Sequence, residues 1–252
     1  MSFDVPAEAY DRFMGRYSRL IAGQMADLAT VTSGQRVLDV GCGPGALTAE
    51  LVRRSGPAFV SAVDPSALFV EAARLRFPGV NVQEAVAERL PFPDDTFDVA
   101  VAQLVVHFMA DPVGGLAEMA RVTRTGGVVA ACVWDHRGGQ GPLSLFWQVA
   151  RQDNPKVEDE SELAGARAGH LAELFEAAGL RAIREAVVTA DLEVPSFEAW
   201  WEPFTHGVGP AGSYVAGLDA EEQARLREAC RRRLPVGSFV VSARAWAVRG
   251  LA

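Results

Sequence analysis

The feature that most constrains the fold is a short apolar run that ends in three closely spaced glycines and continues into a helical pattern. Residues 36–40 read RVLDV, then come Gly41, Gly43 and Gly45, and the apolar residues of 46–54 have helical spacing. Glycines at a strand-to-helix turn allow a sharp bend and let the backbone approach a ligand without a Cβ atom in the way. The segment therefore predicts a buried strand, a ligand-binding loop and a helix in direct succession.

The same alternation of strand and helix patterns continues through the first half of the chain. Strands separated by helices of about ten residues predict βαβ units and a mainly parallel sheet covered on both faces. Right-handed crossovers make such a sheet doubly wound. Strands are expected at 36–40, 59–63, 80–84, 97–103 and 127–133, and helices at 46–54, 66–76 and 112–123.

The alternation is looser after Trp134. We expect one domain over residues 1–252, with a core at 34–135, an N-terminal cap at 1–33 and a helical lid inserted at 194–236. Within the lid, an aromatic stretch at 196–204 is followed by a Gly-rich segment that we expect to be a loop. The remaining segments are predicted as helices at 143–151, 165–178 and 219–233 and strands at 180–190 and 238–248.

Composition and charge exclude several classes of function. With 24 basic and 32 acidic side chains, the net charge of −8 argues against a broad phosphate-binding face, so no nucleic-acid partner is expected. No segment approaches the roughly 20 apolar residues that span a bilayer, and residues 1–13 lack the features of a signal peptide. Three distant cysteines suit a reducing compartment. The sequence predicts a cytoplasmic protein, a monomer or homodimer, without a nucleic-acid or membrane partner.

Two carboxylates beside the glycine loop restrict the ligand. The spacing GxGxG differs from the GxGxxG of dinucleotide-binding proteins. Asp39 precedes the turn, where a carboxylate repels a pyrophosphate but attracts an ammonium group. Asp64 ends the next strand, where an acid accepts hydrogen bonds from ribose hydroxyls. A ligand with a cationic amino-acid end and a nucleoside end matches both acids, and S-adenosylmethionine (SAM) is such a ligand.

At this point the chain resembles the class I SAM-dependent methyltransferases, in particular the small-molecule group often called type 11. The resemblance covers roughly residues 10–134. It implies a doubly wound, Rossmann-like, seven-stranded sheet, mostly parallel with an antiparallel last strand, plus the lid. It also implies in-line SN2 transfer of a methyl group from SAM to a small molecule. The matching motifs are VLDVGCGPG at 37–45, AVDPS at 62–66, AERLPFPDDTFD at 87–98, HFMADP at 107–112 and RVTRTGG at 121–127.

The resemblance also implies which residues bind SAM. Asp64 takes the ribose hydroxyls, and Arg16 is the natural partner of the SAM carboxylate. One position departs from the family pattern, because Val86 stands where an Asp usually contacts the adenine amino group, which leaves adenine recognition to the backbone at Ala87. The positions implied to bind SAM are Tyr10, Arg16, Asp39, Gly41, Cys42, Gly43, Gly45, Asp64, Pro65, Ser66, Ala87, Glu88 and Gln103.

Candidates for the acceptor side come from the segments after the fourth and fifth strands and from the lid. His107 follows the fourth strand, where its neutral imidazole either acts as a general base or simply packs against the pocket wall. Trp134, Trp200, Trp201 and His206 are candidates for substrate contact, although the lid aromatics would equally form a small core of their own.

The residues leave several alternatives open. Asp135 and His136 follow the fifth strand and can reach the substrate mouth, but two polar residues that begin a loop need no special function. The histidines have no metal-ligand spacing, so no metal site is predicted. The rivals to a methyltransferase are a SAM-binding accessory or regulatory protein, a SAM-fold enzyme without methylation, and an NAD-dependent oxidoreductase. The acceptor atom, O, N or C, stays open.

Overall fold

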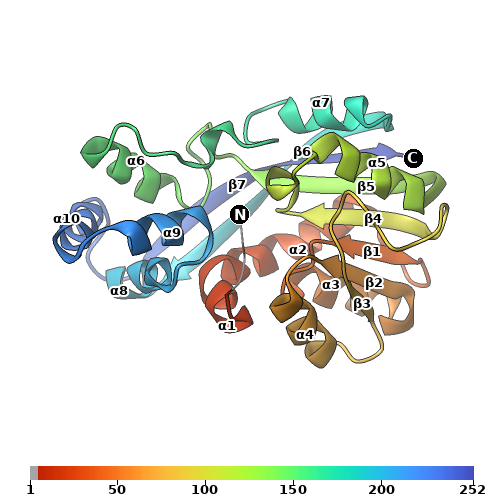
Figure 1. Cartoon of the computed structure of the whole chain (residues 1–252), viewed down its shortest axis with the longest axis horizontal. Helices are drawn as coiled ribbons and strands as arrows, with labels where there is room; N and C mark the ends of the chain where they lie inside the picture. Colours follow the sequence, from red (N-terminus) through yellow and green to blue (C-terminus); the bar gives the residue numbers. More distant parts are fainter. Residues whose placement is uncertain (1–4) are drawn as a thin grey trace.

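The computed structural model describes residues 5–252 and contains a seven-stranded sheet in the order β3-β2-β1-β4-β5-β7-β6 (Figure 1). The sheet is parallel except for β7, which runs antiparallel to both of its neighbours. The predicted doubly wound α/β fold with an antiparallel last strand is confirmed. The strands are β1 (Val37–Val40), β2 (Val60–Asp64), β3 (Asn81–Glu84), β4 (Phe97–Gln103), β5 (Thr123–Trp134), β6 (Arg181–Val194) and β7 (Phe239–Leu251).

Helices cover both faces of the sheet because the central strands are apolar on both sides. In β4, Val99 and Val101 pack in the cluster that contains α2 and α3, whereas Ala100 and Ala102 pack in the cluster that contains α5 and α7. Alternate residues of a strand point to opposite faces, so a continuous apolar run marks a strand buried on both sides. The helices of this part are α2 (Arg16–Leu28), α3 (Ala46–Ser55), α4 (Ala67–Arg76), α5 (Pro112–Val122) and α7 (His170–Ala177).

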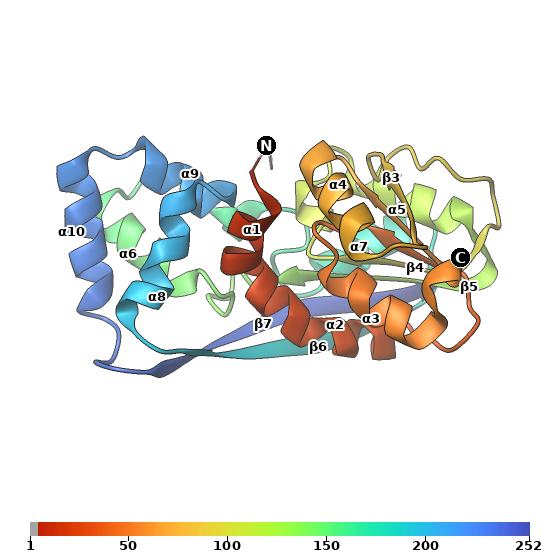
Figure 2. The same cartoon turned by 90° about the horizontal axis from the view of Figure 1, so that it is seen from below.

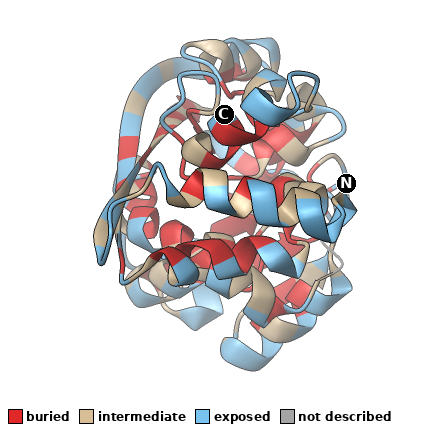
Figure 3. Ribbon diagram, turned by 90° about the vertical axis from the view of Figure 1, so that its left-hand side faces the viewer, coloured by how far each residue is buried: buried red, intermediate tan, exposed pale blue. Residues whose placement is uncertain are grey.

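The two last strands form a ribbon that extends beyond the sheet and carries a separate group of helices (Figure 2). This group has its own hydrophobic core, to which α6 also contributes. Seen from this end, the helices have exposed outer faces and buried inner faces (Figure 3). Its elements are α6 (Ser144–Asp153), α8 (Phe197–Trp201), a 3-10 helix (Glu202–His206), α9 (Gly209–Gly217) and α10 (Ala220–Arg231).

The N-terminal segment lies between the sheet and this helical group (Figure 2). It is one helical stretch made of α1 (Ala7–Tyr10), a π-helix (Asp11–Gly15) and α2. Phe13 packs edge-on against Phe204 with ring centroids 5.1 Å apart, which joins this stretch to the helical group. The segment thus contacts both parts of the molecule.

Two expected elements differ in the structure. The Gly-rich segment expected as a loop forms α9, because Ala211, Gly212 and Val215 are buried and packing outweighs the low helix propensity of glycine. The helix expected at 165–178 begins only at His170, since Gly169 before it has a φ of +76°, outside the helical region.

Candidate functional site

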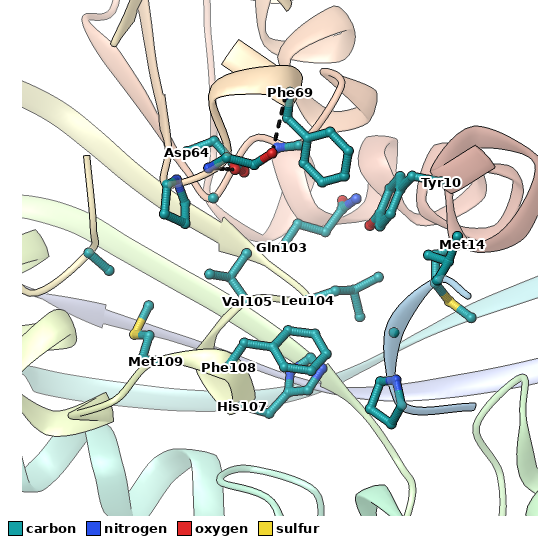
Figure 4. Close-up of a pocket in the computed structure, with 18 of the residues that line it drawn as sticks. Tyr10, Met14, Asp64, Phe69, Gln103, Leu104, Val105, His107, Phe108 and Met109 are labelled. Carbon is teal, nitrogen blue, oxygen red and sulfur yellow. Dashed lines mark hydrogen bonds between the residues drawn. The ribbon is translucent and has the colours of Figure 1, made fainter. Parts of the chain in front are cut away.

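A cavity of about 620 Å³ lies at the carboxyl ends of the parallel strands, where open α/β sheets bind ligands. Figure 4 shows Asp64 and Phe69 on one side of it, His107 and Phe108 on the other, and Gln103 between them. The N-terminal segment and α9 contribute to its wall. The cavity therefore draws on the sheet core, the N-terminal segment and the helical group at once.

Glycines are required in the loop after β1 for steric reasons. Gly41 has a φ of +70°, and a Cβ atom there would lie 2.4 Å from Cγ2 of Val105. Gly45 has a φ of +100°, and its Cβ atom would lie 2.2 Å from Cε2 of Phe77. Larger side chains at either position would displace a packed neighbour and strain the backbone. Gly41 lines the cavity, whereas Gly45 begins α3 behind it.

Asp64 is the best-held acid of the cavity wall. Its Oδ2 accepts a hydrogen bond from the backbone N–H of Gly43 at 2.8 Å, and its Oδ1 accepts one from the N–H of Ser66 at 2.9 Å. Burial raises the pKa of this carboxyl group. Each carboxylate oxygen has a second lone pair, so the side chain still has acceptor capacity for ligand hydroxyls in the cavity.

Asp39 lies buried behind the loop rather than on the cavity wall. Its Oδ2 accepts a hydrogen bond from Oγ1 of Thr48 at 2.6 Å, whereas Oδ1 has no partner among the described residues. Burial raises the pKa of Asp39 to about 7, and the charge of Asp64 adds to the effect. A buried oxygen without a donor is unusual in folded proteins and marks a place where a ligand or water group completes the structure.

The side chains of Gln103 and Tyr10 lie close to the loop. Nε2 of Gln103 donates to the carbonyl oxygen of Ser18 at 3.0 Å, and its Oε1 has no partner among the described residues. Tyr10 packs on Phe69 with ring centroids 5.3 Å apart, and burial raises its pKa to about 12. Both side chains line the cavity, and Tyr10 brings the N-terminal segment onto its rim.

The residues that were expected at the adenine also lie on the cavity wall. Val86 lines this region with an exposed fraction of 47%, and it offers only apolar surface. The carboxylate of Glu88 accepts a hydrogen bond from the backbone N–H of Asp111 at 3.1 Å. The lining positions in this group are Pro65, Ser66, Ala87 and Glu88.

A buried polar cluster faces the cavity from the ends of β4 and β5. His107 and His136 lie with ring centroids 5.8 Å apart, and both imidazoles line the cavity next to Trp134. Burial lowers the pKa of His107 well below its usual range and lowers that of His136 to about 4. Glu160 also lines the cavity, and burial raises its pKa to about 7. No sequence pattern pointed to Glu160, because it lies in a segment without strand or helix periodicity.

Several expected site residues lie away from the cavity. Trp200 and Trp201 are buried in the core of the helical group, where Trp200 packs 4.9 Å from the ring of Phe204. His206 is exposed and lies 2.6 Å from Glu202. The helical group instead lines the cavity with Val208, Gly209 and Pro210. The aromatic residues pack against one another in a core that also contains aliphatic side chains such as Val149, Val215 and Leu226.

Arg16 and Cys42 also lie outside the cavity wall. Nη1 of Arg16 donates to the carbonyl oxygen of Ala199 at 3.2 Å, which ties α2 to α8. Arg16 is six residues beyond Tyr10 in a continuous helical stretch, so the two side chains leave on different faces. Cys42 is buried, and burial raises the pKa of its thiol.

The charges around the cavity are of one sign. The described residues that line it include three acids and neither Lys nor Arg; the acids are Asp64, Glu88 and Glu160. Residues 5–252 contain no group of three or more His, Cys, Asp or Glu side chains placed to hold a metal ion. In the same part of the chain, no helix combines the length and hydrophobicity of a membrane span.

Comparison with known proteins matches residues 38–131 to the family model described as a methyltransferase domain. The chain is 33% identical over 190 residues to 2-methyl-6-phytyl-1,4-hydroquinone methyltransferase of Synechocystis, covering 73% of this chain and 58% of that protein. It is 35% identical over 128 residues to malonyl-[acyl-carrier protein] O-methyltransferase of Erwinia billingiae, covering 51% of this chain and 50% of that protein. The chain thus spans about half the length of the curated relatives it matches.

Solved structures have the same fold. The YcgJ protein from Bacillus subtilis superposes with a TM-score of 0.59 at 20% identity, over 91% of this chain and 97% of the other. At this identity the likeness concerns the fold alone.

Proposed function

This chain belongs, through the domain at residues 38–131, to the methyltransferase family, and from that premise we propose that it transfers a methyl group from SAM to a small-molecule acceptor. The observation that carries the proposal is the cavity wall at Asp64. Its carboxylate is fixed by two backbone N–H groups of the glycine loop and the following turn, and it retains lone pairs for ribose hydroxyls.

The residues present fit SAM. Gly43 leaves room for a ligand beside the loop, since a Cβ atom there would have only Tyr10 within 4 Å, at 3.9 Å. The unpaired Oδ1 of Asp39 and Oε1 of Gln103 are buried acceptors near this loop, and an ammonium group bound there would supply donors to them, directly or through water. Pro65 and the residues that follow it would flank the adenine, with Val86 as an apolar edge. In this arrangement Arg16 ties the N-terminal segment to α8.

When bound, SAM supplies a methyl group on a sulfonium centre, which a nucleophile attacks in line. The protein positions the two reactants and excludes water from them. Phe13, Met14 and Val208 close the cavity from the N-terminal segment and the lid at 194–236, and we propose that these elements select the acceptor. Held near-attack geometry is worth about 7–11 kcal/mol of a barrier, so positioning supplies much of the rate.

The test is the transfer reaction with the full chain. Purified protein is incubated with methyl-labelled SAM and a panel of phenols, aromatic amines, thiols and activated carbon acids. Formation of S-adenosylhomocysteine (SAH) together with a labelled acceptor is the expected result. Tight binding of SAM without SAH formation across the panel would contradict the proposal and favour a SAM-binding accessory or regulatory protein.

A further inference from the structure

We infer that His136, oriented by Glu160, accepts the proton of the methyl acceptor, and that this acceptor is an uncharged aromatic hydroxyl compound. The inference rests on the proposed methyl transfer and assigns its proton acceptor and substrate class. His136 is then a catalytic residue and Glu160 a positioning residue. Both side chains line the cavity and have only 5% of their surface exposed.

The geometry gives His136 a defined orientation. Nε1 of Trp147 donates to Oε2 of Glu160 at 2.8 Å, which fixes the carboxylate in the wall. Nδ1 of His136 lies 4.0 Å from the same Oε2. This separation exceeds a hydrogen bond, but catalytic pairs are commonly longer without substrate and tighten when it binds. With Nδ1–H directed to Glu160, Nε2 becomes the proton acceptor, and Nε2 has no partner among the described residues.

The surrounding charges favour this pair over His107. The carboxylate of Asp135 is bound to Arg244 and to the N–H of Gly138, and Arg151 is bound to Asp159, so these four charged groups are already paired. Even so, the charge of Asp135 raises the pKa of His136, and the carboxylate of Glu160 lies 4.0 Å from its Nδ1, so an imidazolium at His136 has acids close by. His107 has no acid partner among the described residues, and the neighbouring His136 further lowers its pKa. A proton on His107 would be a buried charge without compensation.

A second cavity gives the proton a way out. It has a volume of about 320 Å³, and His136 and Glu160 line it as well as the larger cavity. Its other lining residues include Gln148, Arg151 and Asp159, which are polar or charged. A proton taken up on the acceptor side thus reaches a polar space without passing back through the methyl-transfer site.

The charges of the larger cavity define the acceptor. Asp64 and Glu88 lie on the SAM side, so Glu160 is the acid on the acceptor side, and the described lining residues include neither Lys nor Arg, which disfavours a carboxylate or phosphate acceptor. An ammonium compound would place a second positive charge beside the sulfonium of SAM. A neutral hydroxyl compound avoids both penalties, and apolar side chains such as Phe108, Met109 and Leu143 suit an aromatic ring.

The step is balanced within these groups. The acceptor's O–H bond breaks and its proton moves to Nε2 of His136, while the Nδ1 proton is held by or passes to Glu160. The acceptor oxygen forms a bond to the methyl carbon as the carbon–sulfur bond breaks. The electron pair of the broken carbon–sulfur bond stays on sulfur. The imidazole and Glu160 then lose the proton to water in the second cavity.

The test uses the full chain saturated with SAH and the probe 4-nitrophenol, whose ionised form absorbs visible light. At a pH close to the pKa of the free probe, wild type is expected to hold part of the bound 4-nitrophenol as the phenolate, because Glu160, whose pKa burial raises to about 7, can keep the proton that His136 passes on. Glu160→Gln and His136→Asn should lower the bound phenolate fraction by at least about tenfold, since the proton acceptor is removed or misoriented. The matched control is Glu162→Gln, two residues away, which removes an exposed acid paired with Arg137 and should behave as wild type.

Calorimetric titration of SAH accompanies each variant. If SAH binds but the probe stays unbound or un-ionised in wild type, this inference is overturned while SAM binding stands. The inference also fails if Glu160→Gln retains the phenolate signal or if His107→Asn alone abolishes it. If wild type does not bind SAH at all, the proposed function itself fails.

Discussion

Replacing Asp64 with alanine is expected to weaken SAM binding by roughly 10²-fold. Hydrogen bonds to a charged group are worth about 1.5–3 kcal/mol each, and 1.4 kcal/mol corresponds to a factor of ten. The substitution removes the charged acceptor from the cavity wall and also frees the N–H groups of Gly43 and Ser66, which the carboxylate now holds. Calorimetric titration of the variant with SAM and with SAH measures the loss.

Two further variants show whether the loss is local. Asp64→Asn keeps the shape and one carbonyl acceptor, so its affinity should lie between those of wild type and Asp64→Ala. Asp94→Ala removes an exposed acid paired with Arg121 on the surface, and its SAM affinity should equal that of wild type. If Asp64→Ala folds normally and still binds SAM as wild type does, the ribose site assigned to this cavity is refuted.

Trp200→Ala should lower the free energy of unfolding by about 3–5 kcal/mol, the usual cost of truncating a large buried aromatic side chain. Trp200 is only 1% exposed and packs among Phe197, Trp201 and Phe204 in the core of the helical group. Its removal would leave a cavity at the centre of the aromatic cluster that joins the short helices. Denaturant unfolding followed by circular dichroism measures the change.

The control is Leu75→Ala, which truncates an apolar side chain with 78% of its surface exposed and should change stability by less than about 0.5 kcal/mol. Trp200→Phe retains an aromatic ring and should lose less stability than Trp200→Ala. A Trp200→Ala variant with wild-type stability but impaired acceptor methylation would identify Trp200 as a substrate contact and contradict its place in the core.

The sheet and the loop at its carboxyl edge could be predicted because local patterns determine them. The parallel strands β1 and β4 are mostly apolar and buried along nearly their whole length, since both faces of the sheet are covered. Gly41 and Gly45 have positive φ values and close neighbours that exclude a Cβ atom, so the motif reports a real steric requirement. Asp64 is the last residue of β2. Because β2 lies beside β1 and runs parallel to it, the end of β2 lies next to the glycine loop that follows β1.

The acceptor side could not be predicted because it depends on contacts between distant segments. Glu160 meets His136 only through the packing of α6, whose Trp147 fixes the carboxylate. The segment that forms α9 has the composition of a loop, and only its burial against the helical group makes it a helix. The sequence around Trp200 is the same whether its side chain lines a cavity or fills a core. The direction in which α8 presents this side chain places it in the core.

The most direct test of the central claim is a competition titration of the wild-type protein with SAH and NAD. The cavity with Asp64 and the glycine loop predicts saturable binding of one SAH per chain, displaced by SAM and unaffected by NAD. Binding of NAD that displaces SAH, or the absence of SAH binding, would contradict the assignment of this cavity to SAM.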